Sequence, residues 1–227
     1  KLKKVFPDTK IYLMYGLTEA FRSTYLPPDQ IDIRPTSMGK AIPGCEMMVV
    51  SKEGKLCGPG EVGELVHRGP TVSLGYWGNP DKTQKVFRPN PFLPEGFEEN
   101  ERVVYTGDAV KQDEQGYLYF VGRRDYMIKC YGHRISPTEI EDVIYRIGKV
   151  KLAAAIGVPD SIRGQSIKVF IVLNDNVDLE EDEVLDHCAA TLPQFMMPRF
   201  IEFVDDLPRT GTGKIDISLL KKMEAEG

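Results

Sequence analysis

The sequence predicts an α+β protein in which a β-rich region is followed by a small domain of mixed strands and helices. From about residue 33 to residue 120, short apolar or alternating runs are separated by Gly and Pro, a pattern typical of successive strands. Beyond residues 123–125 (RRD) the order of patterns becomes β-α-β-β-α-β, which favours a mainly antiparallel sheet covered by helices.

The β-rich region is expected to begin with the end of a helix, a turn at Pro7 and Asp8, and a short buried strand over residues 11–15. Further strands are expected where apolar runs lie between turn residues, at 46–50, 63–67, 103–106 and 116–121.

The second region is expected to open with a strand pair over residues 127–135. Ser136, Pro137 and Glu139 then supply an N-cap, a first-turn proline and a capping-box acid, which together predict the start of a helix. Apolar residues recur behind it at helical spacing, so one face of this helix should pack on a sheet. The remaining elements are expected as strands at 153–158, 167–173 and 200–204, and as helices at 179–192 and from 217.

The composition is that of an ordinary soluble globular chain, with 227 residues of which 41% are hydrophobic and 28% charged. A net charge of -5 without a basic block argues against nucleic-acid binding. The longest apolar runs, such as residues 169–173, are far too short for a transmembrane segment.

The four cysteines form no C-x-x-C pair and show no ligand spacing with the three histidines. This predicts free thiols in a reducing cytoplasm and no structural metal. Residues 1–7 lack a signal-peptide core and an initiator methionine, so we expect the chain to begin inside a longer protein.

Four segments combine turn residues with charged or hydroxyl side chains. Residues 15–19 (YGLTE) place a hydroxyl and a carboxylate beside a glycine; alternatively they form a strand-to-helix turn with Thr18 as N-cap. Residues 105–108 (YTGD) form either a turn capped by Asp108 or a site where that carboxylate accepts hydrogen bonds from two ribose hydroxyls. Residues 122–125 (GRRD) fit a solvated, salt-bridged turn.

The fourth segment, residues 208–216 (PRTGTGKID), invites comparison with a phosphate-binding loop but does not match its spacing. Pro208 stands where the first glycine of that pattern would be, and Ile215 follows Lys214 in place of Ser or Thr. The segment could still be a mobile arm that delivers one lysine charge to an oxyanion. The alternative is a flexible surface loop with a solvated lysine.

Taken together and in order, these segments resemble the adenylate-forming superfamily of acyl-CoA synthetases, luciferases and peptide-synthetase adenylation domains. The resemblance covers nearly all 227 residues. It implies that residues 1–124 are the C-terminal part of a large adenylate-forming domain and that residues 125–227 are a mobile C-terminal lid domain. The ordered set consists of segments 15–19, 37–44 (SMGKAIPG), 63–65 (GEL), 75–80 (GYWGNP), 105–108, 122–141 and 208–214.

Members of this superfamily join a carboxylic acid to ATP as an acyl adenylate, release pyrophosphate, and pass the acyl group to a thiol. The resemblance implies that Lys214 and Mg²⁺ offset the negative charge at the α-phosphate, with Glu19 holding the metal. It also implies that Thr18 hydrogen-bonds to the α-phosphate and that Tyr15, next to Gly16, stacks on the adenine.

By the same resemblance, Asp108 accepts the ribose hydroxyls and Arg123 supports the same ribose and phosphate region. Asp125 matches the hinge about which the lid rotates between the two half-reactions. In one orientation Lys214 reaches the phosphate. In the other, the strand pair faces the thiol channel through Lys129, Gly132, His133 and Arg134.

Complete members also carry an N-terminal portion with a Ser/Thr/Gly-rich loop that grips the β- and γ-phosphates, and with most of the acyl pocket. Neither is in this sequence, so we expect the chain alone not to catalyse adenylation. Residues 132–141 (GHRISPTEIE) look more like acyl-CoA ligases than peptide-synthetase domains, which favours coenzyme A over a carrier-protein phosphopantetheine as acceptor. A non-catalytic interaction fragment is the alternative from another class, and the acid substrate cannot be read.

Overall fold

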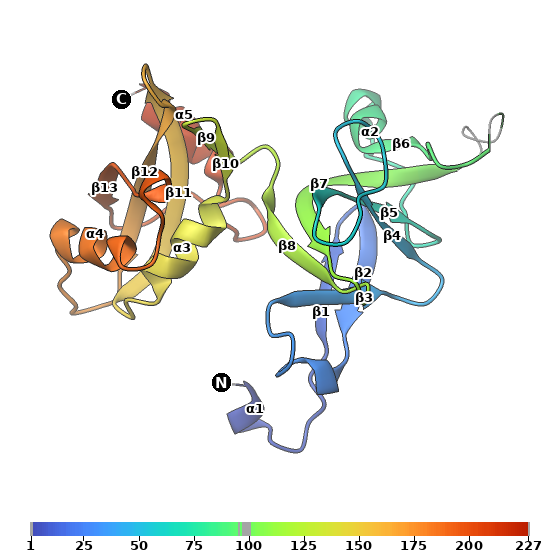
Figure 1. Cartoon of the computed structure of the whole chain (residues 1–227), viewed down its shortest axis with the longest axis horizontal. Helices are drawn as coiled ribbons and strands as arrows, with labels where there is room; N and C mark the ends of the chain where they lie inside the picture. Colours follow the sequence, from blue (N-terminus) through green and yellow to red (C-terminus); the bar gives the residue numbers. More distant parts are fainter. Residues whose placement is uncertain (1, 95, 97–100, 227) are drawn as a thin grey trace. The chain divides into compact units, whose positions relative to one another are not determined.

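The computed structural model describes residues 2–94, 96 and 101–226 of the chain (Figure 1). These residues divide into two compact units, one that ends at Arg124 and one that begins at Asp125. Both units are built on sheets whose strands pair almost entirely antiparallel, with helices added, which confirms the predicted fold class.

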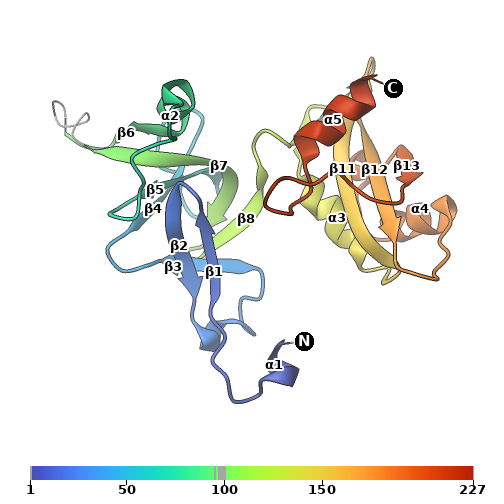
Figure 2. The same cartoon turned by 180° about the vertical axis from the view of Figure 1, so that it is seen from behind.

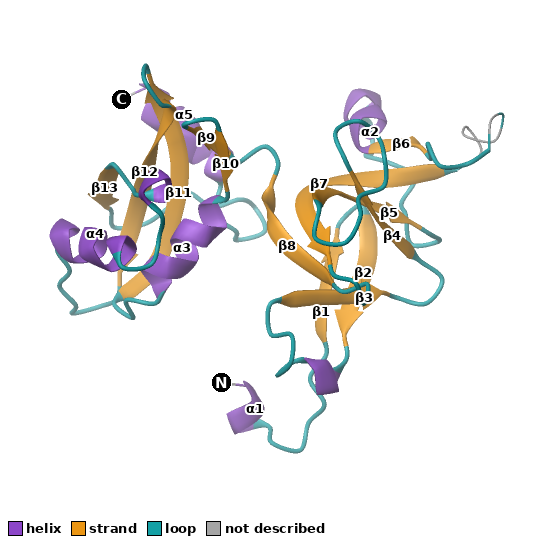
Figure 3. Ribbon diagram, in the orientation of Figure 1, coloured by secondary structure: helices purple, strands orange, loops and turns teal. Residues whose placement is uncertain are grey.

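The first unit contains mostly strands and loops (Figure 3). In its described part the strands form one sheet in the order β1-β2-β3-β8-β7-β5-β4, with β6 paired to β7 and all neighbours antiparallel. The strands are β1 (Leu13–Leu17), β2 (Ala20–Leu26), β3 (Ser37–Ala41), β4 (Glu46–Val50), β5 (Val62–Arg68), β6 (Phe87–Pro89), β7 (Arg102–Gln112) and β8 (Leu118–Arg123). The helical segments are α1 (Leu2–Val5), the 3-10 turn η1 (Pro28–Gln30) and α2 (Pro80–Val86).

This sheet is buried on both faces where β4, β5 and β7 pair. Val49 and Leu65 belong to one apolar cluster, whereas the next residue of each strand, Val50 and Val66, belongs to a second. Because successive side chains of a strand point to opposite faces, the two clusters lie on opposite sides of the sheet. The longer strands of the first unit are therefore held from both sides.

Strand β1 differs from the prediction in place and in burial. It covers Leu13–Leu17 instead of residues 11–15, and Tyr12, Leu13 and Met14 are exposed. The reason is that β1 lies at the edge of the sheet and, in the described chain, hydrogen-bonds to β2 alone. The alternative that Thr18 caps a helix is also wrong, because the chain turns there into strand β2.

The second unit is a sheet with helices on both faces (Figure 2). In its described part the strand order is β10-β9-β12-β11, and β13 pairs with β12 in the parallel sense. The strands are β9 (Ile128–Cys130), β10 (His133–Ile135), β11 (Val150–Asp160), β12 (Gly164–Leu173) and β13 (Phe200–Phe203). The helices are α3 (Pro137–Tyr145), α4 (Glu181–Ala189), the 3-10 turn η3 (Gln194–Met196) and α5 (Ile217–Glu226).

Alternation along β11 and β12 divides the core of this unit into two layers. Ala153 and Val169 join the cluster that contains the apolar faces of α3 and α4. Their chain neighbours Ala154 and Phe170 join the cluster that contains Leu220 of α5. The predicted helix on residues from 137 thus packs on a sheet through one face, as its apolar spacing indicated.

The start of α3 was placed correctly, but its capping hydrogen bonds were not. Ser136 is the N-cap and Pro137 the first helical residue. The Ser136 hydroxyl is buried, makes no cap hydrogen bond and has no hydrogen-bond partner in the described structure. The Glu139 N–H donates instead to the Ser136 carbonyl at 3.2 Å, a main-chain turn bond that takes the place of the side-chain cap.

Two further observations concern the whole described chain. All four cysteines are free, with Cys130 and Cys188 buried. None of the described helices is long and apolar enough to cross a lipid bilayer.

Candidate functional site

The hairpin of β1 and β2 carries four of the predicted site residues, Tyr15, Gly16, Thr18 and Glu19. Leu17 and Ala20 are paired, so Thr18 and Glu19 form the tip; Thr18 is exposed and Glu19 half-buried. Gly16 is required here because a Cβ would lie 2.8 Å from the Arg22 main-chain nitrogen. At this glycine the backbone of β1 therefore approaches its partner strand closely.

Tyr15, Asp108 and Arg123 meet although they lie on β1, β7 and β8. Asp108 and Arg123 are directly paired in the register of β7 and β8, and the Arg123 guanidinium donates to Asp108 Oδ1 at 2.8 Å. The Tyr15 hydroxyl donates to the other oxygen, Oδ2. The Asp108 side chain is only 8% exposed, so its carboxylate is fixed between a phenol and a cation.

Burial and the charge of this carboxylate also set the protonation of the phenol. Desolvation, followed by the negative charge of Asp108, raises the pKa of Tyr15 far above its ordinary value. Tyr15 is therefore a permanent hydrogen-bond donor to Asp108 at neutral pH.

Thr106 supports Asp108 from the main-chain side and was given no role by the sequence. Its hydroxyl donates to the Leu65 carbonyl at 2.8 Å and accepts from the Asp108 N–H at 3.1 Å. The Thr106 carbonyl in turn accepts from Arg123 at 2.8 Å. Position 106 lies inside the recognised segment 105–108, and that was its only signal in the sequence.

Tyr76 is a second residue that the sequence did not single out. Its hydroxyl donates to Glu19 Oε1, and its ring lies edge-on to Phe87 with 5.8 Å between centroids. Burial, then the bond to Glu19, raises the pKa of Tyr76 well above its usual range. The Lys82 ammonium lies 4.0 Å from the ring centroid. Tyr76 thus fixes the carboxylate that was predicted to hold a metal.

Lys214 belongs to the second unit and lies in an ordered turn. Arg209 and Ile215 form a β-bridge, the Thr210 N–H donates to the Lys214 carbonyl at 2.8 Å, and Gly213 has a φ of +82°. The Lys214 side chain is exposed, and its ammonium forms no ion pair with a residue that the structure describes. The Lys214 ammonium can therefore contact an anionic ligand without first losing an ion-pair partner among the described residues.

The residues predicted to face a thiol lie on the hairpin of β9 and β10. Lys129 and Arg134 are paired in its register and both are exposed. Gly132 lies in the turn with a φ of +78°, a left-handed conformation that glycine adopts without the strain that a Cβ would cause. The His133 ring stacks on Phe195 with 4.2 Å between centroids. Asp125, the predicted hinge, is the exposed first residue of this unit.

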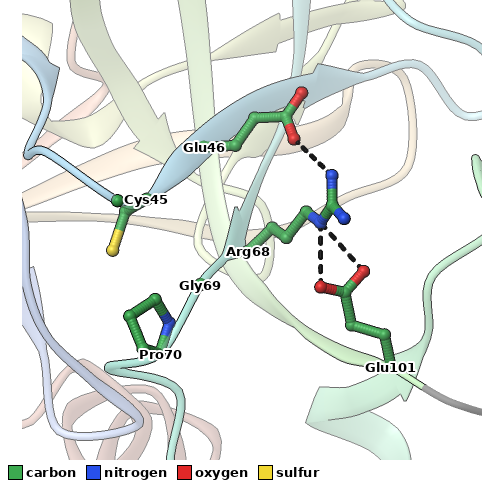
Figure 4. Close-up of a pocket in the computed structure, with 7 residues that line it drawn as sticks. Cys45, Glu46, Arg68, Gly69, Pro70 and Glu101 are labelled. Carbon is green, nitrogen blue, oxygen red and sulfur yellow. Dashed lines mark hydrogen bonds and ion pairs between the residues drawn. The ribbon is translucent and has the colours of Figure 1, made fainter.

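A hollow in the first unit contains none of these residues. It has a volume of about 480 Å³ and is lined by residues 44–46, 68–70 and 101 (Figure 4). Arg68 is paired there with Glu46 at 3.0 Å and with both oxygens of Glu101 at 2.8 and 2.9 Å. Because this cation is already neutralised by two carboxylates, the Asp108 cluster is the better candidate for a site.

Two family models match the chain: "AMP-binding enzyme" over residues 1–77 and "AMP-binding enzyme C-terminal domain" over residues 139–214. A long-chain-fatty-acid–CoA ligase of Escherichia coli O157:H7 is 36% identical over 201 residues, 88% of this chain and 34% of its own length. The chain thus spans about a third of the length of the curated relatives it matches.

Two solved structures are similar over almost the whole chain. ATP-bound MatB from Rhodopseudomonas palustris has a TM-score of 0.79 at 32% identity and covers 94% of this chain and 40% of its own. The o-succinylbenzoate CoA synthetase MenE from Bacillus subtilis, in complex with its acyl-adenylate intermediate, has a TM-score of 0.81 at 27% identity and covers 93% and 41%.

Proposed function

Because the chain belongs to the family of AMP-binding enzymes, we propose that the complete protein is an AMP-forming ligase that joins a carboxylic acid to a thiol. The observation that carries the proposal is the meeting of Tyr15, Asp108 and Arg123. A largely buried carboxylate that Tyr15 and Arg123 orient is the kind of group that accepts hydrogen bonds from the vicinal hydroxyls of a ribose. Its pre-set geometry suits the nucleotide of ATP, and Tyr15 offers a ring to the adenine.

In the first half-reaction, an oxygen of the substrate carboxylate forms a bond to the α-phosphorus of ATP. The bond between that phosphorus and its bridging oxygen breaks, and pyrophosphate leaves. Both reactants are anions, so cations must stabilise the charge that gathers on the phosphorus oxygens. We assign this role to the exposed ammonium of Lys214, with the exposed Thr18 hydroxyl donating to an α-phosphate oxygen.

The chemistry of Glu19 fits a magnesium ligand. One of its oxygens accepts from Tyr76, and no described residue bonds to the other. Mg²⁺ is usually held in nucleotide sites by one or two carboxylates together with substrate phosphates. When bound, Mg²⁺ would neutralise charge on the phosphate oxygens, while Tyr76 keeps the carboxylate of Glu19 oriented.

In the second half-reaction, the thiol sulfur attacks the acyl carbon, the bond to the adenylate oxygen breaks, and AMP leaves. We assign the thiol side to Lys129, Gly132, His133 and Arg134, of which the three charged or aromatic side chains are exposed. Residues 125–227 would act as a lid that rotates about Asp125 between the two steps. The names of the relatives favour coenzyme A as the thiol and a fatty acid as the acid.

The test uses the complete protein with ATP, Mg²⁺, coenzyme A and a panel of carboxylic acids. We expect acid-dependent release of pyrophosphate and AMP, and we expect Asp108→Asn to raise the KM for ATP by about tenfold because it weakens the acceptor of the ribose hydroxyls. The 227-residue chain alone should support no pyrophosphate exchange. Absence of ATP or AMP binding by the complete protein would instead favour a non-catalytic interaction role. Acyl adenylate supplied with coenzyme A or with a phosphopantetheinyl carrier identifies the acceptor.

A further inference from the structure

A buried carboxylate holds the last residue of the first unit. Glu64, on β5, has a side chain that is only 7% exposed, and each of its carboxylate oxygens has its own donor. The Gly107 N–H donates to Oε1 at 3.0 Å, and the Arg124 guanidinium donates to Oε2. The Arg124 N–H completes a ring by donating to the Gly107 carbonyl at 2.9 Å.

This ring lies at the end of the pairing between β7 and β8. Asp108 and Arg123 are register partners, so Gly107 and Arg124 are the next pair along the two strands. Gly107 has a φ of +73°, which lets the main chain turn so that its N–H points to Glu64. Charge-assisted hydrogen bonds to a buried carboxylate are strong, and removal of one donor leaves a buried charge without its partner.

The residues that follow belong to the second unit, where the Lys221 ammonium of α5 lies 5.6 Å from the centroid of the Tyr126 ring. Burial lowers the pKa of Lys221, and the negative charge of Asp125 partly opposes this. The backbone is therefore hydrogen-bonded within the first unit as far as Arg124, and from Tyr126 its side chains contact the second unit.

We propose that the ion pair of Glu64 and Arg124 fixes the end of strand β8, and with it the start of the linker to the second unit; we call this pair the mount. Because the mount holds Arg124, the backbone is free to rotate at the junction of Arg124 and Asp125. This inference rests on the proposed function, in which rotation at Asp125 separates two half-reactions. Glu64 and Arg124 are positioning residues in it. Because Gly107 precedes Asp108, the same carboxylate also supports the turn that carries the ribose-binding residue.

The first test measures amide hydrogen exchange in the 227-residue chain by NMR. Arg124→Met removes the charged donor and should accelerate exchange at positions 107 and 124 by about tenfold. Glu64→Gln keeps an oxygen for the Gly107 N–H, so it should accelerate position 124 more than position 107. Arg124→Lys keeps a positive charge and should restore most of the protection.

Arg68→Met is the matched control, because it removes an arginine that is paired with glutamates elsewhere in the same unit. It should leave exchange at positions 107 and 124 unchanged. Unaltered exchange in Arg124→Met, or equal acceleration by Arg68→Met, would overturn the mount.

The second test measures the two half-reactions in the complete protein. Arg124→Met should slow both by about fivefold, a larger effect than any on the KM for ATP, because a looser linker lowers the fraction of correctly placed lids. Arg124→Lys should recover most of both rates. Wild-type rates in Arg124→Met would overturn the positioning role. If the complete protein forms no acyl adenylate, the proposed function fails, and the exchange rates alone then decide whether the mount exists.

Discussion

Glu141 should destabilise the second unit at neutral pH, and its replacement by glutamine should reveal this. The residue lies on α3, and its Oε1 accepts from the Ala155 N–H on β11 at 2.9 Å. Burial is the larger influence and raises the pKa of Glu141 to about 6, from an ordinary 4.5. A glutamine would keep an oxygen for the Ala155 N–H without a buried charge.

The sign and size of the effect follow from proton linkage. A carboxyl with a higher pKa in the folded state holds its proton more tightly there, so folding stability falls as the pH rises from 4.5 to about 6. The pKa differs by about 1.5 between the folded and unfolded states, and each pKa unit corresponds to about 1.4 kcal/mol, so the loss of folding stability is about 2 kcal/mol. Glu141→Gln should therefore match the wild type at about pH 4 and exceed its stability by up to about 2 kcal/mol at about pH 7.

The free energy of unfolding should be read from amide exchange in β11 and β12 under mild denaturant. Tryptophan fluorescence would not serve, because the single tryptophan, Trp77, is fully exposed in the first unit. Glu139→Gln is the control: it makes the same change on the same helix at an exposed position and should alter stability by less than about 0.5 kcal/mol. A Glu141→Gln difference that is independent of pH would refute the reasoning.

Three further predictions concern the site and its scaffold. Lys214→Ala in the complete protein should abolish adenylate formation yet leave thioester formation from supplied acyl adenylate largely intact; equal loss of both half-reactions would refute its role. Tyr76→Phe removes the donor to Glu19 and should raise the Mg²⁺ concentration for half-maximal pyrophosphate release by about tenfold, and an unchanged Mg²⁺ dependence would contradict it. Gly39→Ala should destabilise the first unit by about 3 kcal/mol or more, because its Cβ would lie 1.9 Å from the Tyr25 carbonyl oxygen. Gly44, the control position, has a similar φ of +80° and no atom within 4 Å of its added Cβ, so Gly44→Ala should lower the stability by only about 1 kcal/mol. Thermal melts followed by circular dichroism compare the two variants, and equal losses of stability would exclude the clash.

The sequence could predict the elements whose patterns are local. The apolar runs of β11 and β12 and the Ser136–Pro137 helix start are of this kind, and both were found close to their expected places. The Thr18 turn was ambiguous because a strand-to-helix turn and a hairpin tip use similar residues, and only pairing with β2 decides between them. Burial of β1 was misjudged because an apolar run does not tell whether another element covers it.

In the candidate site too, the sequence could name residues within local segments but not the contacts between distant segments. Asp108 and Arg123 could be named from their segments, but their direct pairing depends on the register of β7 and β8, which is bulged between Ala109 and Val110. Tyr76 was missed because its partner Glu19 is distant in sequence, and nothing in segment 75–80 specifies a hydrogen bond to it. Glu64 and Arg124 were missed for the same reason.

The division of the chain into two units places the proposed roles on opposite sides of one junction. Asp108, Tyr15 and Glu19 lie before Arg124, whereas Lys214 lies after Asp125. The printed donors to the Asp108 carboxylate, Tyr15 and Arg123, both belong to the first unit, so we expect a nucleotide to bind there without Lys214. If the proposed roles hold, the two units separate binding from charge stabilisation, so Lys214→Ala should lower kcat for adenylation far more than it raises the KM for ATP. A rise in KM alone would mean that Lys214 contributes to binding and not to the transition state.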